Sequence, residues 1–264
     1  TGLIRDEHGQ KVAQAAAAGA SPVEQALIEA LASRYALPQP EDRKPLEQAY
    51  ADAMRKVWKQ YPKDADVGAL FADAAMNLRP WDLWSPEGEP RPETPEIQAT
   101  IEAALAMVPD HPMACHEYIH TMEASPMPEK ALPAANVLRT RVPGAGHLVH
   151  MPAHIDIRLG HYNDAVIANQ KGVEIDRTWA SQGGFYTLYR AHNFHFLAWA
   201  AMFEGRKATT MDAMKGMQEQ ISLDLVRAYP DFLDAFMGAP VHAMVRFGMW
   251  NEILEIPTPP ADLQ

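Results

Sequence analysis

Apolar residues recur along most of the chain at spacings of three and four residues, which is the pattern of a helix with one buried face. Alanine is abundant and runs of β-branched residues are scarce, and both features favour helix. The pattern predicts helices over 22–35, 45–60, 66–78, 94–107, 112–124, 128–140, 147–159, 162–176, 185–203, 207–227 and 232–247. We therefore predict an all-α fold, arranged as a single helical domain over 1–264.

Local signals mark where some of these helices begin and end. Ser21, Pro22 and Glu24 form a helix start, with a capping serine, a proline in the first position and a glutamate in the third. The stretch 79–94 contains four prolines and Gly88, so it is predicted to be a loop inserted between paired helices. Pro152 fits only near the start of a helix, so the regular turns are expected to begin close to it.

Composition narrows the classes of partner. The chain has 264 residues, 47% hydrophobic and 22% charged, as expected for a globular protein. Its net charge is −11 and no block of lysine and arginine forms a basic stripe, so we expect neither nucleic acid nor an anionic membrane surface as a partner. The single cysteine, Cys115, excludes an intrachain disulfide. We also expect residues to be missing at both ends of this sequence.

Two histidine pairs lie 34 residues apart. His116 and His120 are spaced i, i+4, and the same spacing recurs at His150 and His154. Residues at this spacing share one face of a helix. An offset of 34 residues is also the period of one helical hairpin in a tetratricopeptide array.

The chain resembles tetratricopeptide-repeat proteins over roughly 45–254. The stretch Gly160-His-Tyr-Asn-Asp-Ala165 matches the turn between the two helices of such a repeat, and Ala165 follows Ala131 by 34 residues. The His-rich segments around 116–125 and 146–154 are similar to those of a poorly characterised bacterial group within this class. The resemblance implies a TPR-like α-solenoid whose groove could bind a protein partner or a peptide, and it implies no settled reaction.

Three sets of polar side chains fall on successive first helices of the predicted hairpins. At about 100° per residue, the members of each set project from one side of their helix. The sets are His116, His120 and Glu123; His147, His150 and His154; and His192 and His195 with Tyr189. First helices line the concave face of a tetratricopeptide array, so we expect all three sets to face one groove.

Seven of the eleven histidines belong to these sets, and a packed core has little use for so many imidazoles. We therefore predict a metal site with ligands His116, His120, Glu123, His147, His150, His154, His192 and His195. This donor set exceeds the four ligands of one zinc ion and suits two ions. Nitrogen-rich helical sites favour copper or iron and dioxygen chemistry, so the leading interpretation is a dinuclear oxidoreductase acting on a small or peptide-like substrate.

Within that interpretation, Glu123 and Tyr189 are the candidate catalytic residues, and His242 is a further candidate for the site. Two alternatives stay open. The segment His116-Glu117-Tyr-Ile-His120 matches the H-E-x-x-H motif of zinc peptidases, which makes a zinc-dependent hydrolase the first alternative. A non-catalytic scaffold that binds metal or peptides is the second. Glu117 is expected to face solvent or to support a ligand from behind.

Overall fold

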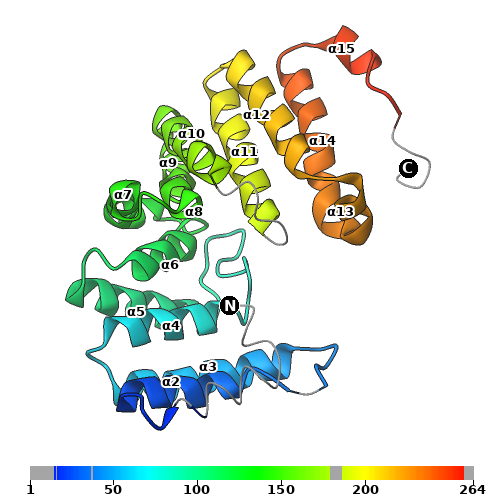
Figure 1. Ribbon diagram of the computed structural model, residues 1–264. Coiled ribbons are helices and arrows are strands. Elements are labelled where there is room, and N and C mark those ends of the chain that lie inside the picture. The colour runs from blue at the N-terminus through cyan, green and yellow to red at the C-terminus, as the bar shows by residue number, and fades with distance from the viewer. Residues whose placement is uncertain (1–14, 16, 37, 179–185, 259–264) are drawn as a thin grey trace. The chain divides into compact units, whose positions relative to one another are not determined.

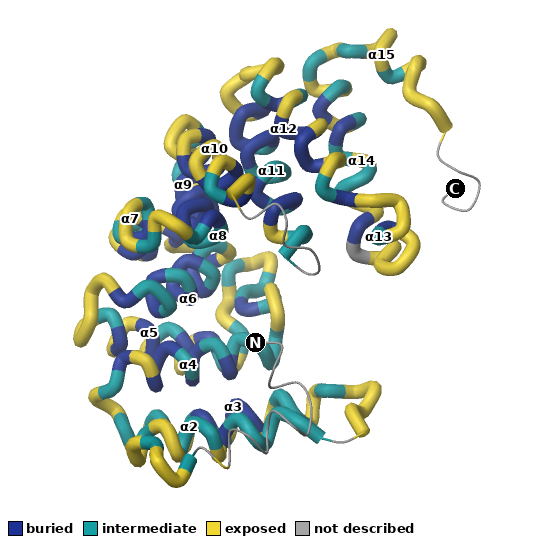
Figure 2. Tube along the Cα trace, viewed as in Figure 1, coloured by how far each residue is buried: buried dark blue, intermediate teal, exposed yellow. Residues whose placement is uncertain are grey.

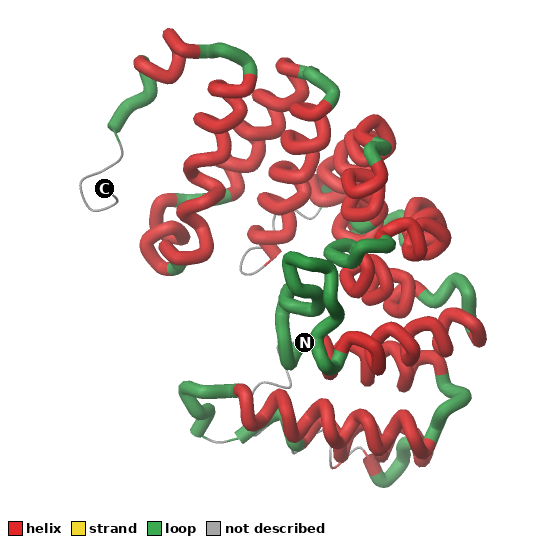
Figure 3. Tube along the Cα trace, turned by 180° about the vertical axis from the view of Figure 1, so that it is seen from behind, coloured by secondary structure: helices red, strands yellow, loops and turns green. Residues whose placement is uncertain are grey.

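The computed structural model describes residues 15, 17–36, 38–178 and 186–258, and most of them are helical (Figures 1 and 3). Within these ranges the only β-type pairing is an isolated bridge between Trp84 and Pro90. The all-α prediction is therefore confirmed. The chain divides into two compact units: unit 1 ends at Ala134, and unit 2 begins at Ala135.

Unit 1 is a succession of helices in which each packs on its neighbour in sequence. Its helices are α2 (Pro22–Ala32), α3 (Lys44–Gln60), α4 (Ala65–Met76), α5 (Thr94–Met107) and α6 (Pro112–Met122), followed by the 3₁₀ helix η2 (Pro128–Ala131). Helix α6, which carries His116 and His120, also contacts α4. Helix α7 (Leu132–Arg141) contains the boundary between the units.

Unit 2 continues with helices that also pack as sequential neighbours. They are α8 (Gly146–His150), α9 (Pro152–Leu159), α10 (Tyr162–Arg177), α11 (Tyr186–Phe203), α12 (Lys207–Gln220), α13 (Leu223–Ala228), α14 (Pro230–Arg246) and α15 (Trp250–Leu254). Helix α10 contacts α8, α9 and α11, while α11 packs on α12 (Figure 1). Such consecutive helix pairs are the arrangement of tetratricopeptide-like hairpins.

The local sequence explains several helix ends. The Ser21 hydroxyl accepts a hydrogen bond from the Glu24 amide at 3.4 Å, and the Glu24 carboxylate accepts one from the Ser21 amide at 2.8 Å, which completes the predicted capping box. Helix α9 ends at Gly160, whose φ of 78° lies in the left-handed region that glycine adopts without steric cost. Pro152 is the first residue of α9, as its missing amide hydrogen requires.

The structure divides three of the predicted ranges and contains one further helix; the range 128–140 consists of the 3₁₀ helix η2 followed by α7. The range 147–159 contains two helices, because Pro152 cannot donate a backbone hydrogen bond. The range 207–227 is also divided, since the Ser222 hydroxyl caps a new helix by accepting from the Leu225 amide at 3.2 Å. Helix α15 was not predicted. The 79–94 loop is confirmed, apart from Thr94, which already belongs to α5.

Small side chains and methionines fill the core of unit 2, which appears in Figure 2 as the dark blue part of α10, α11 and α12. Ala165, Ala198 and Ala201 are fully buried and allow the helix backbones to approach closely, while Met214 and Met217 fill the remaining space. This core fixes α10 and α11, which carry Asn169 and His192. None of the described helices combines the length and the apolar character needed to cross a membrane.

Candidate metal centre

Three imidazole rings converge in unit 2. The Nε2 atom of His150 lies 2.9 Å from Nε2 of His154 and 3.1 Å from Nε2 of His192. One ring nitrogen from each of the three residues lies within 4.8 Å of the others. The structure therefore brings together three of the predicted ligands. In both of these pairs the atoms that approach each other are Nε2 atoms.

The junction between α8 and α9 sets the relative position of His150 and His154. Met151 connects the two helices with φ −50° and ψ −38°, so the chain keeps helical geometry across the point where Pro152 interrupts the hydrogen bonds. The two histidines consequently remain one turn apart on a shared face, with ring centroids 4.8 Å apart. His192 reaches the same place from α11, which packs on α8.

Asn169 on α10 determines which nitrogen of His150 carries the proton. Its side-chain nitrogen donates to the Ala165 carbonyl at 2.7 Å, so its side-chain oxygen faces His150. That oxygen lies 2.7 Å from Nδ1 of His150 and can only accept a hydrogen bond. His150 therefore holds its proton on Nδ1 and presents a lone pair at Nε2.

This single lone pair faces two nitrogen atoms, although a neutral ring nitrogen can accept only one strong hydrogen bond. A metal ion held here would resolve the conflict, because it would accept one lone pair from each ring. Bonds of about 2.0–2.1 Å with ligand angles of about 90–110° separate neighbouring nitrogen ligands by about 2.8–3.4 Å. The observed separations of 2.9 and 3.1 Å fall inside that range.

The surroundings of His150 keep its ring neutral, and an aromatic ring covers all three imidazoles. His150 is fully buried and His154 is 7% exposed. Burial is the largest effect on the pKa of His150 and, together with repulsion from His154, His192 and His147, holds it well below the ordinary value. Phe196 packs against all three rings, with centroid distances of 4.9, 4.4 and 5.1 Å, and forms an apolar wall.

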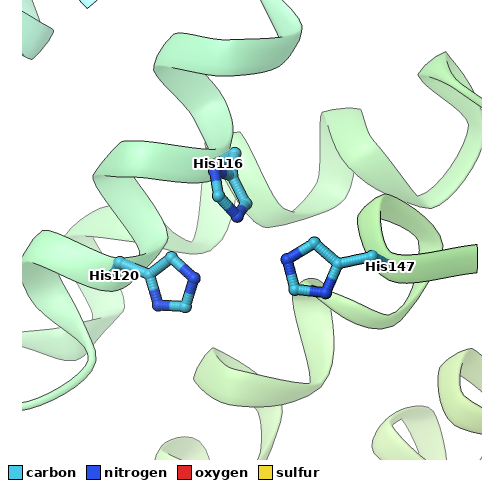
Figure 4. A group of neighbouring side chains, drawn as sticks. All are labelled: His116, His120 and His147. Atoms are coloured by element: carbon cyan, nitrogen blue, oxygen red, sulfur yellow. The ribbon is translucent and has the colours of Figure 1, made fainter. Parts of the chain in front are cut away.

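His147 and Tyr189 lie beside the three-histidine cluster. The ring of His147, on α8 (Figure 4), stacks on His150 with centroids 5.7 Å apart. Tyr189 meets the His147 ring edge-on at 4.8 Å and is 38% exposed. The predicted catalytic tyrosine thus lies at the accessible side of the cluster, with His147 between it and His150.

His195 and His242 do not join the three rings. His195 packs against Phe236 and Trp199, at centroid distances of 5.3 and 6.1 Å, and burial lowers its pKa. His242 is exposed and meets Trp199 at 5.4 Å. Although His192 and His195 are spaced i, i+3, the ring of His192 meets His150 of α8 while that of His195 meets Phe236 of α14. The assignment of His195 as a metal ligand stays a prediction.

Unit 1 carries the other histidine pair. His116 and His120 extend from the same side of α6 (Figure 4), with ring centroids 4.8 Å apart and ring planes at 87°. The Nδ1 atom of His116 lies 2.9 Å from a Glu117 oxygen, and that of His120 lies 2.8 Å from a Glu123 oxygen. Glu123, which was predicted to be a metal ligand, therefore contacts Nδ1 of His120.

Charged groups surround this pair. Burial acts to lower the pKa of His120, but the hydrogen bond and charge of Glu123 and the charge of Glu117 outweigh it and raise the pKa. Glu117 is only 6% exposed. Burial and the charge of Glu117 raise the pKa of Asp73 to about 6. Glu117 was expected either to face solvent or to contact a ligand. In the structure it is buried and contacts Nδ1 of His116.

Sequence reasoning missed Asn169 and Phe196. Asn169 is fully buried among Ala165, Val166, Gly172 and Val173 on the apolar face of α10, and a polar residue on an apolar stripe is a signal that could have indicated it. No comparable signal indicates Phe196, because its contacts depend on the packing of α11 against α8 and α9. The sharing of one groove by the histidines of α6 and those of unit 2 stays a prediction.

A cavity of about 360 Å³ lies among α10, α11 and α12, and it is separate from the histidines. Asp176, Arg190, Phe194 and Gly216 are among its lining residues, and no histidine lines it. Phe194 and Phe196 leave α11 in different directions, the first toward this cavity and the second toward the three rings.

Comparisons with known proteins place the chain in no family. No protein-family model matches it, and no curated protein matches its sequence. Among solved structures, it is similar to MamA (residues 41 to the end) from Desulfovibrio magneticus RS-1 at 13% sequence identity and a TM-score of 0.48. That match covers 71% of this chain and 89% of the other. The helical-hairpin description above rests on the helix packing of the chain itself.

Proposed function

We propose that this protein binds a transition metal ion through Nε2 of His150, His154 and His192 and uses it as an oxidoreductase. The observation that carries the proposal is the convergence of two nitrogen atoms on the one lone pair of His150, at separations that suit metal ligands. Asn169 prepares this site, because it keeps the proton of His150 away from the metal side.

The donor set guides the choice of metal. Three neutral nitrogen ligands suit copper, iron or zinc and are unsuitable for magnesium or calcium, which take oxygen ligands. Three ligands also leave coordination positions open for dioxygen and a substrate. Copper or iron in such a site would pass electrons from an oxidisable substrate to dioxygen, and Tyr189, beside His147, is positioned to exchange a proton near the cluster. A small or peptide-like molecule remains the proposed substrate.

A zinc-dependent hydrolase is the second candidate, because three histidines with an open position are also an arrangement of catalytic zinc. The metal acquired by the protein in its native cells distinguishes the two candidates. Copper or iron whose electron paramagnetic resonance signal changes reversibly on reduction supports the oxidoreductase. Stoichiometric zinc, with hydrolysis restored by zinc alone after removal of all metals, supports the hydrolase.

Metal content tests the binding site itself. Full-length protein is compared with His154→Ala and His192→Ala after dialysis against buffered copper or zinc. Each variant should lose one equivalent of metal relative to the wild type. The matched control is His161→Ala, since His161 is an exposed residue at the start of α10 outside the three-histidine cluster. Retention of the full metal content by both folded site variants would contradict the proposal.

A further inference from the structure

We infer that His116 and His120 in unit 1 form a second transition-metal site, which binds a divalent cation through their Nε2 atoms. The inference extends the proposed metal-binding function to unit 1 and rests on residues of α6 alone for its ligands. It also assigns Glu117 and Glu123 as positioning residues for those ligands. Glu123 was predicted to be a metal ligand; here it is instead the hydrogen-bond partner of the ligand His120.

The first observation is the arrangement of the two rings. They lie one helical turn apart on the same side of α6, with centroids 4.8 Å apart and planes nearly perpendicular (Figure 4). Histidines at i, i+4 on a helix can bind one metal ion, as in the H-E-x-x-H motif. The His116 and His120 side chains are 21% and 22% exposed, so an ion can reach them from solvent while they stay partly enclosed.

The second observation is that each ring has a carboxylate on its Nδ1 atom. Glu117 contacts His116 at 2.9 Å and Glu123 contacts His120 at 2.8 Å. A carboxylate at Nδ1 holds the proton there and leaves the Nε2 lone pair for a metal, and it increases the basicity of that lone pair. Two neighbouring histidines with this same support match the usual environment of metal-ligating imidazoles.

The charge around the rings also favours a cation. Glu117 is buried, and a buried carboxylate is costly unless a positive group compensates it. Helix α6 ends at Met122, so His120 and Glu123 lie at its negative end, where a cation is stabilised. In unit 2, by contrast, the apolar ring of Phe196 packs against the three histidines. The unit 1 pair therefore suits a divalent ion that retains bound water.

The test uses full-length protein with the background substitution H154A/H192A, which removes the site in unit 2. Zinc ion is the probe, measured by equilibrium dialysis against a zinc buffer. We expect the background to bind one equivalent and to lose it when H116Q/H120Q is added. Adding H161A/H242A instead is the matched control, because it removes two exposed histidines, and it should leave the equivalent bound.

The variant Glu123→Gln tests whether Glu123 positions His120 for metal binding or only stabilises the fold. In the same background it should retain one equivalent but bind it about 10–100-fold more weakly, because the amide supports His120 less well than the carboxylate does. Unchanged affinity in this variant would overturn the role of Glu123.

The second site is overturned if the folded background binds no zinc, or if H116Q/H120Q leaves the bound equivalent in place. Equal zinc content in the wild type and in H154A/H192A would instead overturn the proposed site in unit 2. If the background substitutions unfold the protein, H116Q/H120Q is compared directly with the wild type. It should then lose one equivalent of zinc, and unchanged zinc content overturns the inference.

Discussion

Asn169 fixes the tautomer of His150 through a contact of 2.7 Å between its side-chain oxygen and Nδ1 of the ring. The two residues are 19 positions apart and lie on different helices, α10 and α8. The contact leaves the lone pair of this buried histidine on Nε2, as the proposed metal binding requires. The Nε2 atoms of His154 and His192 matter for this proposal because both lie close to that lone pair of His150.

Asn169→Ala should weaken metal binding in unit 2 about 10–100-fold, the usual effect of removing the hydrogen-bond partner of a ligating histidine. The ring of His150 would then be free to carry its proton on either nitrogen. Competition with a chelating indicator measures the change in affinity. Asn163→Ala is the control, since Asn163 is exposed on the same helix and accepts a hydrogen bond from Arg206. An affinity equal to that of the wild type would show that Asn169 has no influence on the site.

The sequence predicted the helices well because their boundaries depend on local chemistry, such as the capping box at Ser21 and the proline at 152. Spacing alone also selected His150, His154 and His192, which the structure brings together, while their role as metal ligands stays a prediction. Spacing did not show that His195 would pack against Phe236 of α14, because helical periodicity alone does not distinguish the face of α11 toward α8 from the face toward α14. Asn169 and Glu117 took on supporting roles that only tertiary packing and side-chain rotamers define.

Gly146→Ala should destabilise the protein, because the position at the start of α8 has no room for a side chain. A Cβ there would lie 2.1 Å from an oxygen of Asp176 and 2.9 Å from the carbonyl oxygen of Gly172. Overpacking of this kind typically costs about 1–3 kcal/mol in the free energy of unfolding. Urea unfolding monitored by circular dichroism measures the loss.

The matched control for that substitution is Gly144→Ala. No atom lies within 4 Å of a Cβ at Gly144, and its φ is not in the left-handed region. The control should therefore leave the free energy of unfolding nearly unchanged, or raise it slightly by restricting the unfolded chain. Equal stability of the two variants would contradict the close packing of α8 against α10.

Asp73→Asn should stabilise the protein near neutral pH and have little effect near pH 4. Burial and the charge of Glu117 raise the pKa of Asp73 from its ordinary value of 3.8 to about 6 in the folded protein. The folded state therefore binds a proton more tightly than the unfolded chain, and ionised Asp73 opposes folding above about pH 6. This unfavourable contribution disappears as the pH falls from about 6 to below 4.

Urea unfolding at pH 7.5 and pH 4 measures this difference. Asp234→Asn is the control, because Asp234 is an exposed residue of α14. A stabilising effect of Asp73→Asn that is the same at both pH values would contradict the raised pKa.

Cys115 should react slowly with thiol reagents in the folded protein. Its side chain is fully buried, and burial together with the charge of Asp110 raises its pKa to about 11. Only the thiolate is nucleophilic, so alkylation by iodoacetamide at pH 8 should be far slower than in protein unfolded by urea. Mass spectrometry of the modified protein over time gives both rates. Equal rates in the two states would place Cys115 in solvent.

The most direct test of the central claim is a crystal structure of the copper-loaded protein with diffraction recorded at the copper absorption edge. The structure predicts an anomalous peak at about 2.0–2.1 Å from Nε2 of each of His150, His154 and His192, with Nδ1 of His150 still bonded to Asn169. Density that shows the three rings joined only by hydrogen bonds, with every copper ion bound elsewhere, would contradict it.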